Sequence, residues 1–233
     1  MKKEPPEIRV FVVGWAALTG EAKELSKVSI NEYTVENLQR AMFEAVSMAD
    51  LSVGRAELLL LRPQVSVWLR SERGLCARMV LCGDVIQMIS GVGATIDFDP
   101  YMYDGMEYLR ADATDAWEKP PEISVVIVGS DPGTGEERWI ASSTCEEYSF
   151  ENVESLIQDA LGDAGDEVGA ESLPRWKPRV VVQPTLCRDA RPSMHFTAEL
   201  IRRMAEAGAS LEFDPSVYDA IDDHSSDVHS TDA

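Results

Sequence analysis

The chain has 233 residues, of which 45% are hydrophobic and 27% are charged, and its formal net charge is −20. This composition excludes an intrinsically disordered protein, because enough apolar side chains are present to build a core. The strong negative charge disfavours nucleic acid and anionic membranes as partners, and it favours association with cationic surfaces.

No apolar run follows the opening residues 1–6, and no stretch of about 18 apolar residues occurs in the chain. We therefore expect neither a signal peptide nor a membrane span, and we expect the chain to lie in the cytoplasm. The four cysteines are ordinary reduced thiols in our interpretation, because none recurs at an equivalent position in the repeat described next. We expect no metal and no other cofactor.

The sequence repeats itself at an offset of 115 residues without a gap. Residues 5–8 match residues 120–123, and Phe98-Asp99-Pro100 matches Phe213-Asp214-Pro215; about three in ten aligned positions are identical. A repeat of this length is the size of a small domain and is longer than a solenoid unit. We expect a first repeat at 1–104, a connector at 105–119, a second repeat at 120–219, and an acidic, disordered tail at 220–233.

The expected elements follow the same order in each repeat. A β-branched run ending in glycine predicts an opening strand at 8–14 and again at 123–129. A second strand is expected near 24–31 and 138–144. A helix follows, with Thr34 or Ser149 as its N-cap and apolar residues at helical spacing.

The later part of each repeat contains extended segments, a short strand and a second helix. We expect extended segments at 58–61, 65–69 and 180–182, and a short strand near 77–81 or 193–196. The second helix is expected to end at Gly93 or Gly208, where glycine readily adopts a left-handed C-cap. The order β-β-α-β-β-α-β predicts an α+β fold of two tandem homologous two-layer domains related by a pseudo-twofold, each with an antiparallel sheet and two helices.

One segment resembles a known family. Residues 196–218, from an aromatic residue through Thr-Ala-Glu-Leu-Ile-Arg-Arg-Met to Phe-Asp-Pro-Ser-Val-Tyr, are similar to the C-terminal signature of domain-of-unknown-function family 4279. Residues 138–143 resemble its tryptophan-containing strand. The resemblance implies a bacterial domain without an established catalytic site, which is sometimes encoded near toxin genes.

Catalytic chemistry has little support in the sequence. Two of the three histidines, His224 and His229, fall in the expected tail, and His195 aligns with Val80 of the first repeat. We interpret His195 as a strand residue, although a nucleophilic pair with Cys187 stays open. The five tryptophans are expected to lie mostly in the core, with exposed tryptophans as the alternative because they anchor interfaces. We expect a protein that is not an enzyme.

The candidate partner-binding residues are acidic. One group marks the segment in which the second repeat gains charge over the first, and it comprises Asp159, Asp163, Asp166, Glu167 and Glu171. The other group follows the last strand and comprises Glu212, Asp214 and Asp219, opposite Asp97, Asp99 and Asp104 in the first repeat. The alternatives for this second group are a solvated strand end, which needs no function, and a calcium site.

Charge is divided unequally between the repeats. Residues 1–118 contain 12 basic and 18 acidic residues, giving −6, whereas residues 119–233 contain 9 and 23, giving −14. We therefore expect a binding protein that neutralises a basic protein partner, with an immunity protein that occludes the active site of a bacterial toxin as the leading hypothesis. The alternatives are a bacterial interaction or scaffold domain without a toxin partner, and an enzyme or small-ligand protein that uses the cleft between the repeats.

Overall fold

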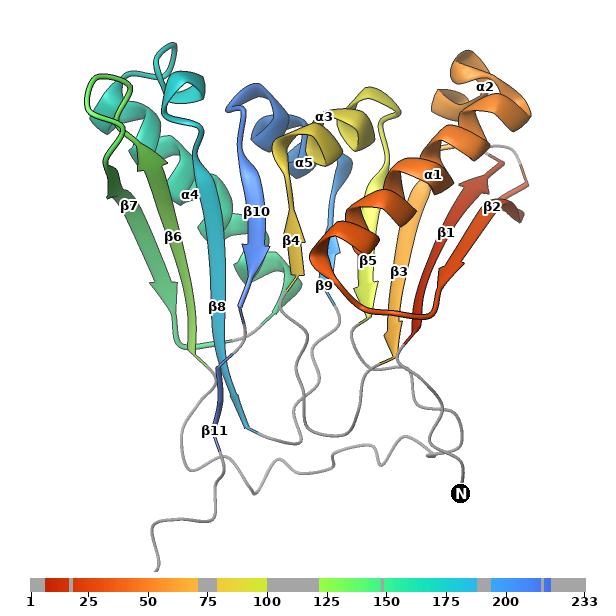
Figure 1. Cartoon of the computed structure of the whole chain (residues 1–233), viewed down its shortest axis with the longest axis horizontal. Coiled ribbons are helices and arrows are strands. Elements are labelled where there is room, and N and C mark those ends of the chain that lie inside the picture. Colours follow the sequence, from red (N-terminus) through yellow and green to blue (C-terminus); the bar gives the residue numbers. More distant parts are fainter. Residues whose placement is uncertain are drawn as a thin grey trace, which may run out of the picture.

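The computed structural model describes residues 7–16, 19–70, 79–99, 122–147, 149–187, 194–214 and 216–218. The expected connector at 105–119, the expected tail at 220–233 and the candidate residue Asp219 lie outside these ranges. The fold is α+β, with two sheets and with helices packed on them (Figure 1).

The described residues of the first half form eight elements in sequence order. They are β1 (Glu7–Trp15), β2 (Ala22–Ile30), α1 (Val35–Val53), α2 (Arg55–Leu60), β3 (Gln64–Arg70), β4 (Met79–Leu81), α3 (Gly83–Gly91) and β5 (Thr95–Asp99).

The second half follows the same order and adds a strand at its end. Its elements are β6 (Glu122–Ser130), β7 (Glu137–Cys145), α4 (Phe150–Val168), the 3-10 helix η1 (Leu173–Trp176), β8 (Arg179–Cys187), β9 (Met194–Phe196), α5 (Ala198–Glu206), β10 (Ser210–Phe213) and β11 (Ser216–Tyr218). The bounds of β2, α1, β4 and α3 return 115 residues later in β7, α4, β9 and α5.

Local signals in the sequence explain the starts and ends of the helices. The Thr34 hydroxyl accepts a hydrogen bond from the Asn37 N–H at 3.0 Å, and the Ser149 hydroxyl accepts one from the Asn152 N–H at 3.1 Å. Both residues are therefore N-caps, as predicted. Gly93 and Gly208 have φ values of 62° and 64°, which confirms the left-handed turn expected after the second helix.

The apolar run at 58–61 was expected to be extended, and this prediction is wrong. Gly54 adopts a φ of 82° at the end of α1, and the chain then forms the short helix α2. Leu58 is fully buried on that helix, whereas Leu59 and Leu60 are exposed. A short run of apolar residues does not distinguish a strand from a helix, and here the turn at Gly54 places only one leucine toward the core.

The sheets are mixed, which corrects the expectation of antiparallel sheets. Sheet A has the order β2-β1-β3-β5-β9, and β3 and β5 are parallel in it. Sheet B has the order β4-β10-β8-β6-β7, with β11 also pairing with β8, and β8 is parallel to β10 and β11. The chain returns in the same direction because a helix, α3 or α5, lies between the two parallel strands along the chain.

The two sheets exchange strands. The first-half strand β4 pairs with β10 in sheet B, and the second-half strand β9 pairs with β5 in sheet A. Each exchanged strand forms one edge of the sheet that it joins. The expectation that each repeat builds its own sheet is thus corrected.

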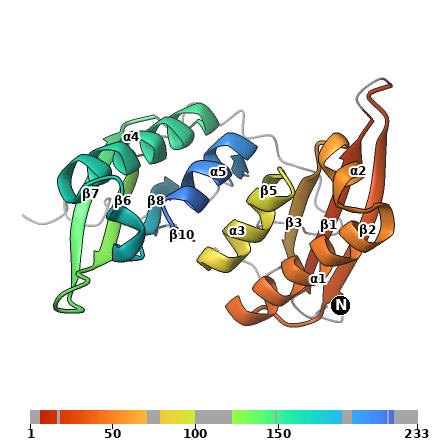
Figure 2. The same cartoon turned by 90° about the horizontal axis from the view of Figure 1, so that it is seen from above.

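One hydrophobic core joins the two sheets. Figure 2 shows α1 and α4 on opposite sides of the molecule, with α3 and α5 side by side between them. The rings of Phe98 on β5 and Phe213 on β10 meet edge to face, with their centroids 6.4 Å apart. Met79 and Leu81 of β4 and Met194 and Phe196 of β9 are buried in the same cluster. The exchanged strands therefore contribute to the shared core.

Candidate binding surfaces

The first candidate is an acidic surface on α4. Its carboxylates are Asp159, Asp163, Asp166 and Glu167 on the helix and Glu171 just after it, and all five are exposed. We call this set the α4 acidic surface. Residues three and four apart lie on the same helix face, so the side chains at 159, 163 and 166 are neighbours.

No basic side chain of α4 offsets these charges. The helix sequence contains six acidic residues and no lysine or arginine. Asp163, Asp166 and Glu167 lie toward its C-terminal end, where the helix dipole already presents partial negative charge. A carboxylate in the last turn destabilises a helix by roughly 0.3–1 kcal/mol at low salt. Helix stability therefore does not explain these residues.

Neighbouring elements neutralise the surface only at its edge. Arg138 on β7 lies 3.9 Å from Glu167, and its guanidinium also stacks over the ring of Trp176 at 4.6 Å. Within the part of the chain that the structure describes, Asp159, Asp163 and Asp166 form no ion pair. The centre of the α4 acidic surface is consequently exposed and forms no ion pair with a described residue.

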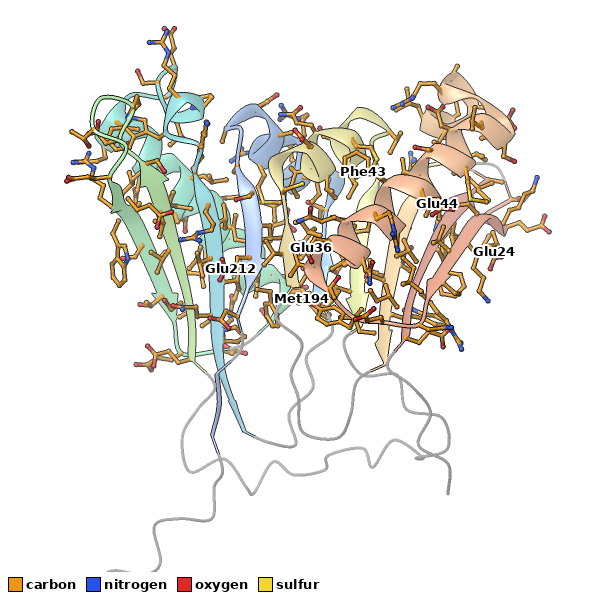
Figure 3. All side chains as sticks on the ribbon, viewed as in Figure 1. Glu24, Glu36, Phe43, Glu44, Met194 and Glu212 are labelled. Atoms are coloured by element: carbon orange, nitrogen blue, oxygen red, sulfur yellow. The ribbon has the colours of Figure 1, made fainter. Side chains whose placement is uncertain are left out.

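The two described residues of the second predicted acidic group, Glu212 and Asp214, do not form an exposed acidic surface. Glu212 on β10 (Figure 3) is only 5% exposed. Its carboxylate lies 3.7 Å from the Arg179 guanidinium. Asp214 is half-buried, and its N–H donates to the Val182 carbonyl oxygen at 2.9 Å. The sequence places Glu212 on an alternating strand face, but it does not reveal that neighbouring side chains cover that face.

A further group of polar and aromatic side chains lies across sheet A, on the face opposite the core. Strand pairing aligns one residue from each of the five strands, in the order Lys27, Phe11, Ser66, Asp97 and His195. We call this set the sheet A row. The aligned positions in sheet B are occupied by Ser142, Val126, Val181, Glu212 and Val80. Of the two sheets, sheet A alone therefore combines a lysine, a phenylalanine and a histidine at these aligned positions.

Asp97 is the centre of the polar contacts in the sheet A row. Its Oδ1 lies 2.8 Å from His195 Nδ1, and its Oδ2 accepts a hydrogen bond from the Gln64 amide. The His195 and Asp97 side chains are 40% and 42% exposed, so water reaches the pair. Aspartate contact at Nδ1 orients the imidazole and leaves Nε2 for other interactions.

Phe11, the aromatic residue of the sheet A row, lies on β1 next to Trp68 of β3. The Phe11 and Trp68 rings are tilted with their centroids 4.7 Å apart, and Lys27 Nζ lies 5.1 Å from the Phe11 ring centroid. Trp15, Trp68 and Trp139 are exposed, which contradicts the expectation that tryptophans lie mostly in the core; Trp176 is buried. Trp117 lies outside the described residues.

The histidine pair is the feature that sequence reasoning missed. The sequence predicts His195 in a strand, and the structure confirms this in β9. Its partner Asp97 is 98 residues away in the chain and belongs to the other half. The strand exchange brings them together, and no local sequence signal marks that exchange.

The described part of the chain offers no other chemistry around His195. No serine, threonine or cysteine with a described side chain donates a hydrogen bond to it. The described residues contain no group of three or more histidine, cysteine or acidic side chains that is arranged to hold a metal ion. Cys82 and Cys145 are free thiols, whereas the side chains of Cys76 and Cys187 lie outside the described set.

Among the helices in the described ranges, none has both the length and the apolar character needed to cross a membrane.

Neither a protein-family model, nor a curated protein, nor a solved structure matches this chain.

Proposed function

We propose that this protein binds a basic protein partner through the α4 acidic surface. The observation that carries this proposal is the group of exposed carboxylates at 159, 163 and 166, which form no ion pair with any described residue. Two of them lie toward the end of the helix, where they oppose its dipole. Charges that destabilise their own helix and have no partner within the described chain are explained by an external cation. Their exposure also allows long-range attraction, which accelerates association.

The partner that we propose is a bacterial toxin, and the chain would be its immunity protein in the cytoplasm. Toxins that act on nucleic acid need basic surfaces to bind phosphate, and such a surface is complementary to the α4 acidic surface. Binding there would cover the substrate path without any catalytic step. The resemblance of residues 196–218 to a family sometimes encoded near toxin genes agrees with this proposal.

We also propose that the two halves arose by duplication and that the second half then specialised. The recurrence of helix and strand bounds at an offset of 115 residues supports this history. So does the irregularity that interrupts the β1–β2 pairing between Val12 and Val13 and returns in β6–β7 between Ile127 and Val128. The difference between the net charges of −6 and −14 agrees with specialisation of the second half.

The alternative of a scaffold domain without a toxin partner uses the same acidic surface. A small-ligand site in a cleft between the halves has less support, because the buried residues of both sheets belong to one apolar cluster.

The proposal is tested by co-expression with the protein encoded by the neighbouring gene of the native genome. We expect that protein to inhibit growth when expressed alone and to be tolerated together with this chain. The variant Asp163→Lys/Asp166→Lys should lose protection and weaken binding of the purified partner. Its matched control is Glu36→Lys/Glu44→Lys on α1, which makes the same change in net charge on the other helix (Figure 3).

Three results would contradict the proposal. They are equal growth with and without the chain, equal effects of the two double variants, and a binding rate that does not fall with added salt. Because screening over a Debye length of about 10 Å at 0.1 M salt weakens exposed charges, the binding rate must fall if these carboxylates attract the partner.

A further inference from the structure

A second exposed surface lies at the junction of α1 and α2, and it is apolar. Leu51 at the end of α1 is 88% exposed and Leu60 at the end of α2 is 73% exposed. Met48, Leu59 and Trp15 are also exposed. We call these five residues the α1–α2 apolar surface. Single exposed leucines are common in proteins, but several large apolar side chains around one turn mark an interaction site.

The local structure holds these side chains at one end of the molecule. Gly54 turns the chain sharply between the helices, and Leu58 buries α2 against the core. The Trp15 N–H donates to the Leu61 carbonyl oxygen at 2.6 Å, which ties the end of β1 to the end of α2. Leu58 provides the buried contact of α2, and the Leu59 side chain also lies near Gly93. Leu51 and Leu60 are largely exposed, so packing within the chain does not require them.

The second half has different residues at the same places. At an offset of 115, Met48 and Leu51 correspond to Asp163 and Asp166, and Leu60 corresponds to Arg175. The fold therefore accepts charged residues at these positions. Apolar residues in the first half are a property of that surface and not a requirement of the helix.

We propose that the α1–α2 apolar surface binds a second copy of this chain in a symmetric dimer. Two identical apolar patches meet across a twofold axis without leaving either exposed, and closed twofold dimers are the commonest assembly of this kind. The charged rim also permits self-contact. Arg55 and Asp50 form an ion pair at 2.7 Å, and the exposed Glu57 and Arg62 nearby carry opposite charges.

The distribution of charge favours this end of the molecule for self-association. Two copies that each carry a net charge of −20 repel one another, and most of that charge belongs to the second half. Figure 1 shows α2 and α4 at opposite ends of the long axis. Contact through α1 and α2 thus leaves the α4 acidic surfaces of the two copies at the outer ends of the dimer, where salt screens their repulsion most effectively. The inference is independent of the proposed toxin partner.

Sedimentation of the purified full chain over a wide concentration range tests this proposal. We expect a reversible dimer that persists at high salt, because apolar burial is not screened. The variant Met48→Asp/Leu51→Asp takes its residues from the second half and should weaken the dimer by at least roughly tenfold. Leu60→Arg alone should also weaken it, and it provides a second measurement if the double variant folds poorly.

The matched control is Trp139→Glu, which places the first-half residue Glu24 at the corresponding position near the other end of the molecule. Trp139 is 74% exposed, so a general effect of removing exposed apolar surface should appear there as well. A wild-type chain that stays monomeric at every concentration overturns the proposal. So does a dimer that survives both α1–α2 variants or that is lost in Trp139→Glu.

Discussion

Helices α1 and α4 have the same length and the same kind of N-cap, and each ends at a glycine with a φ of 82° or 84°, yet their outward surfaces differ. Their inward residues stay small or apolar at corresponding positions, as at Ala45 and Ala160. Their outward residues change from Met48 and Leu51 to Asp163 and Asp166. Packing constrains one face of each helix, whereas the other face accepts side chains of different charge and polarity.

The largest expected effect tests whether the two halves unfold independently of one another. Phe196 is fully buried on β9, and this strand completes the sheet of the other half. Phe196→Ala should lower the free energy of unfolding by about 3–5 kcal/mol, because it leaves a cavity in the shared core. Hydrogen exchange should show protection lost from β3 and β5 as well as from β8 and β10.

The exposed substitution Ser47→Ala is the control and should change stability by no more than about 0.5 kcal/mol. Phe196→Leu is a milder variant in case the alanine variant does not fold. Loss of protection confined to the second half would show that β9 does not couple the sheets, and the halves would then be independent domains.

Much of each half is predictable from sequence because its signals are local. The caps at Thr34 and Ser149 and the β-branched runs of β1 and β6 give the element order directly. The strand exchange is different, because Ile96 and Phe98 on β5 have apolar counterparts in Leu211 and Phe213 on β10. The hydrophobic pattern alone therefore does not decide whether β4 or β9 pairs with β5, or which of them pairs with β10.

For the same reason, only part of the candidate sites was predictable from the sequence. The α4 acidic surface was predictable, since charge and helical spacing are both visible in the sequence. The burial of Glu212 and the pairing of His195 with Asp97 depend on which strands become neighbours. Tertiary contacts of this kind require the register of the sheets, and no residue near His195 in the chain encodes it.

An effect of intermediate size is expected from the acidic residues of α4 that α1 lacks at the corresponding positions. Asp163→Asn and Asp166→Asn each remove a negative charge from the C-terminal half of α4, and each should raise the free energy of unfolding by up to about 1 kcal/mol at low salt. The control Glu151→Gln removes the same charge from the first turn, where a carboxylate stabilises the helix dipole. Urea unfolding of this control should therefore show a loss of stability.

Opposite signs at the two ends of α4 would show that position, and not total charge, decides the effect. If all three variants stabilise the protein equally, relief of its overall negative charge explains the result. In that case the acidic residues do not oppose the dipole of their own helix.

The smallest expected effect concerns the second helices, α3 and α5. Glu199 on α5 pairs with Arg202 at 2.6 Å and with Arg203 at 3.3 Å, whereas the corresponding positions on α3 are Asp84, Gln87 and Met88. The hydrogen bond from Arg202, followed by that from Arg203, lowers the pKa of Glu199. A carboxyl whose pKa is lower in the folded state stabilises the protein above its ordinary pKa, and this contribution is lost as the pH falls through the lowered value.

Glu199→Gln should therefore slightly reduce stability at neutral pH and have no effect once the pH is below the folded-state pKa. The decrease should be small because the side chains of Arg202 and Glu199 are about half exposed and water screens their charges. Unfolding of Glu199→Gln, Arg202→Gln and the double variant across this pH range measures the interaction, since the single effects should not add. A decrease that persists equally at acid pH would assign the effect to helix propensity, and α5 would then differ from α3 without any contribution from its ion pairs.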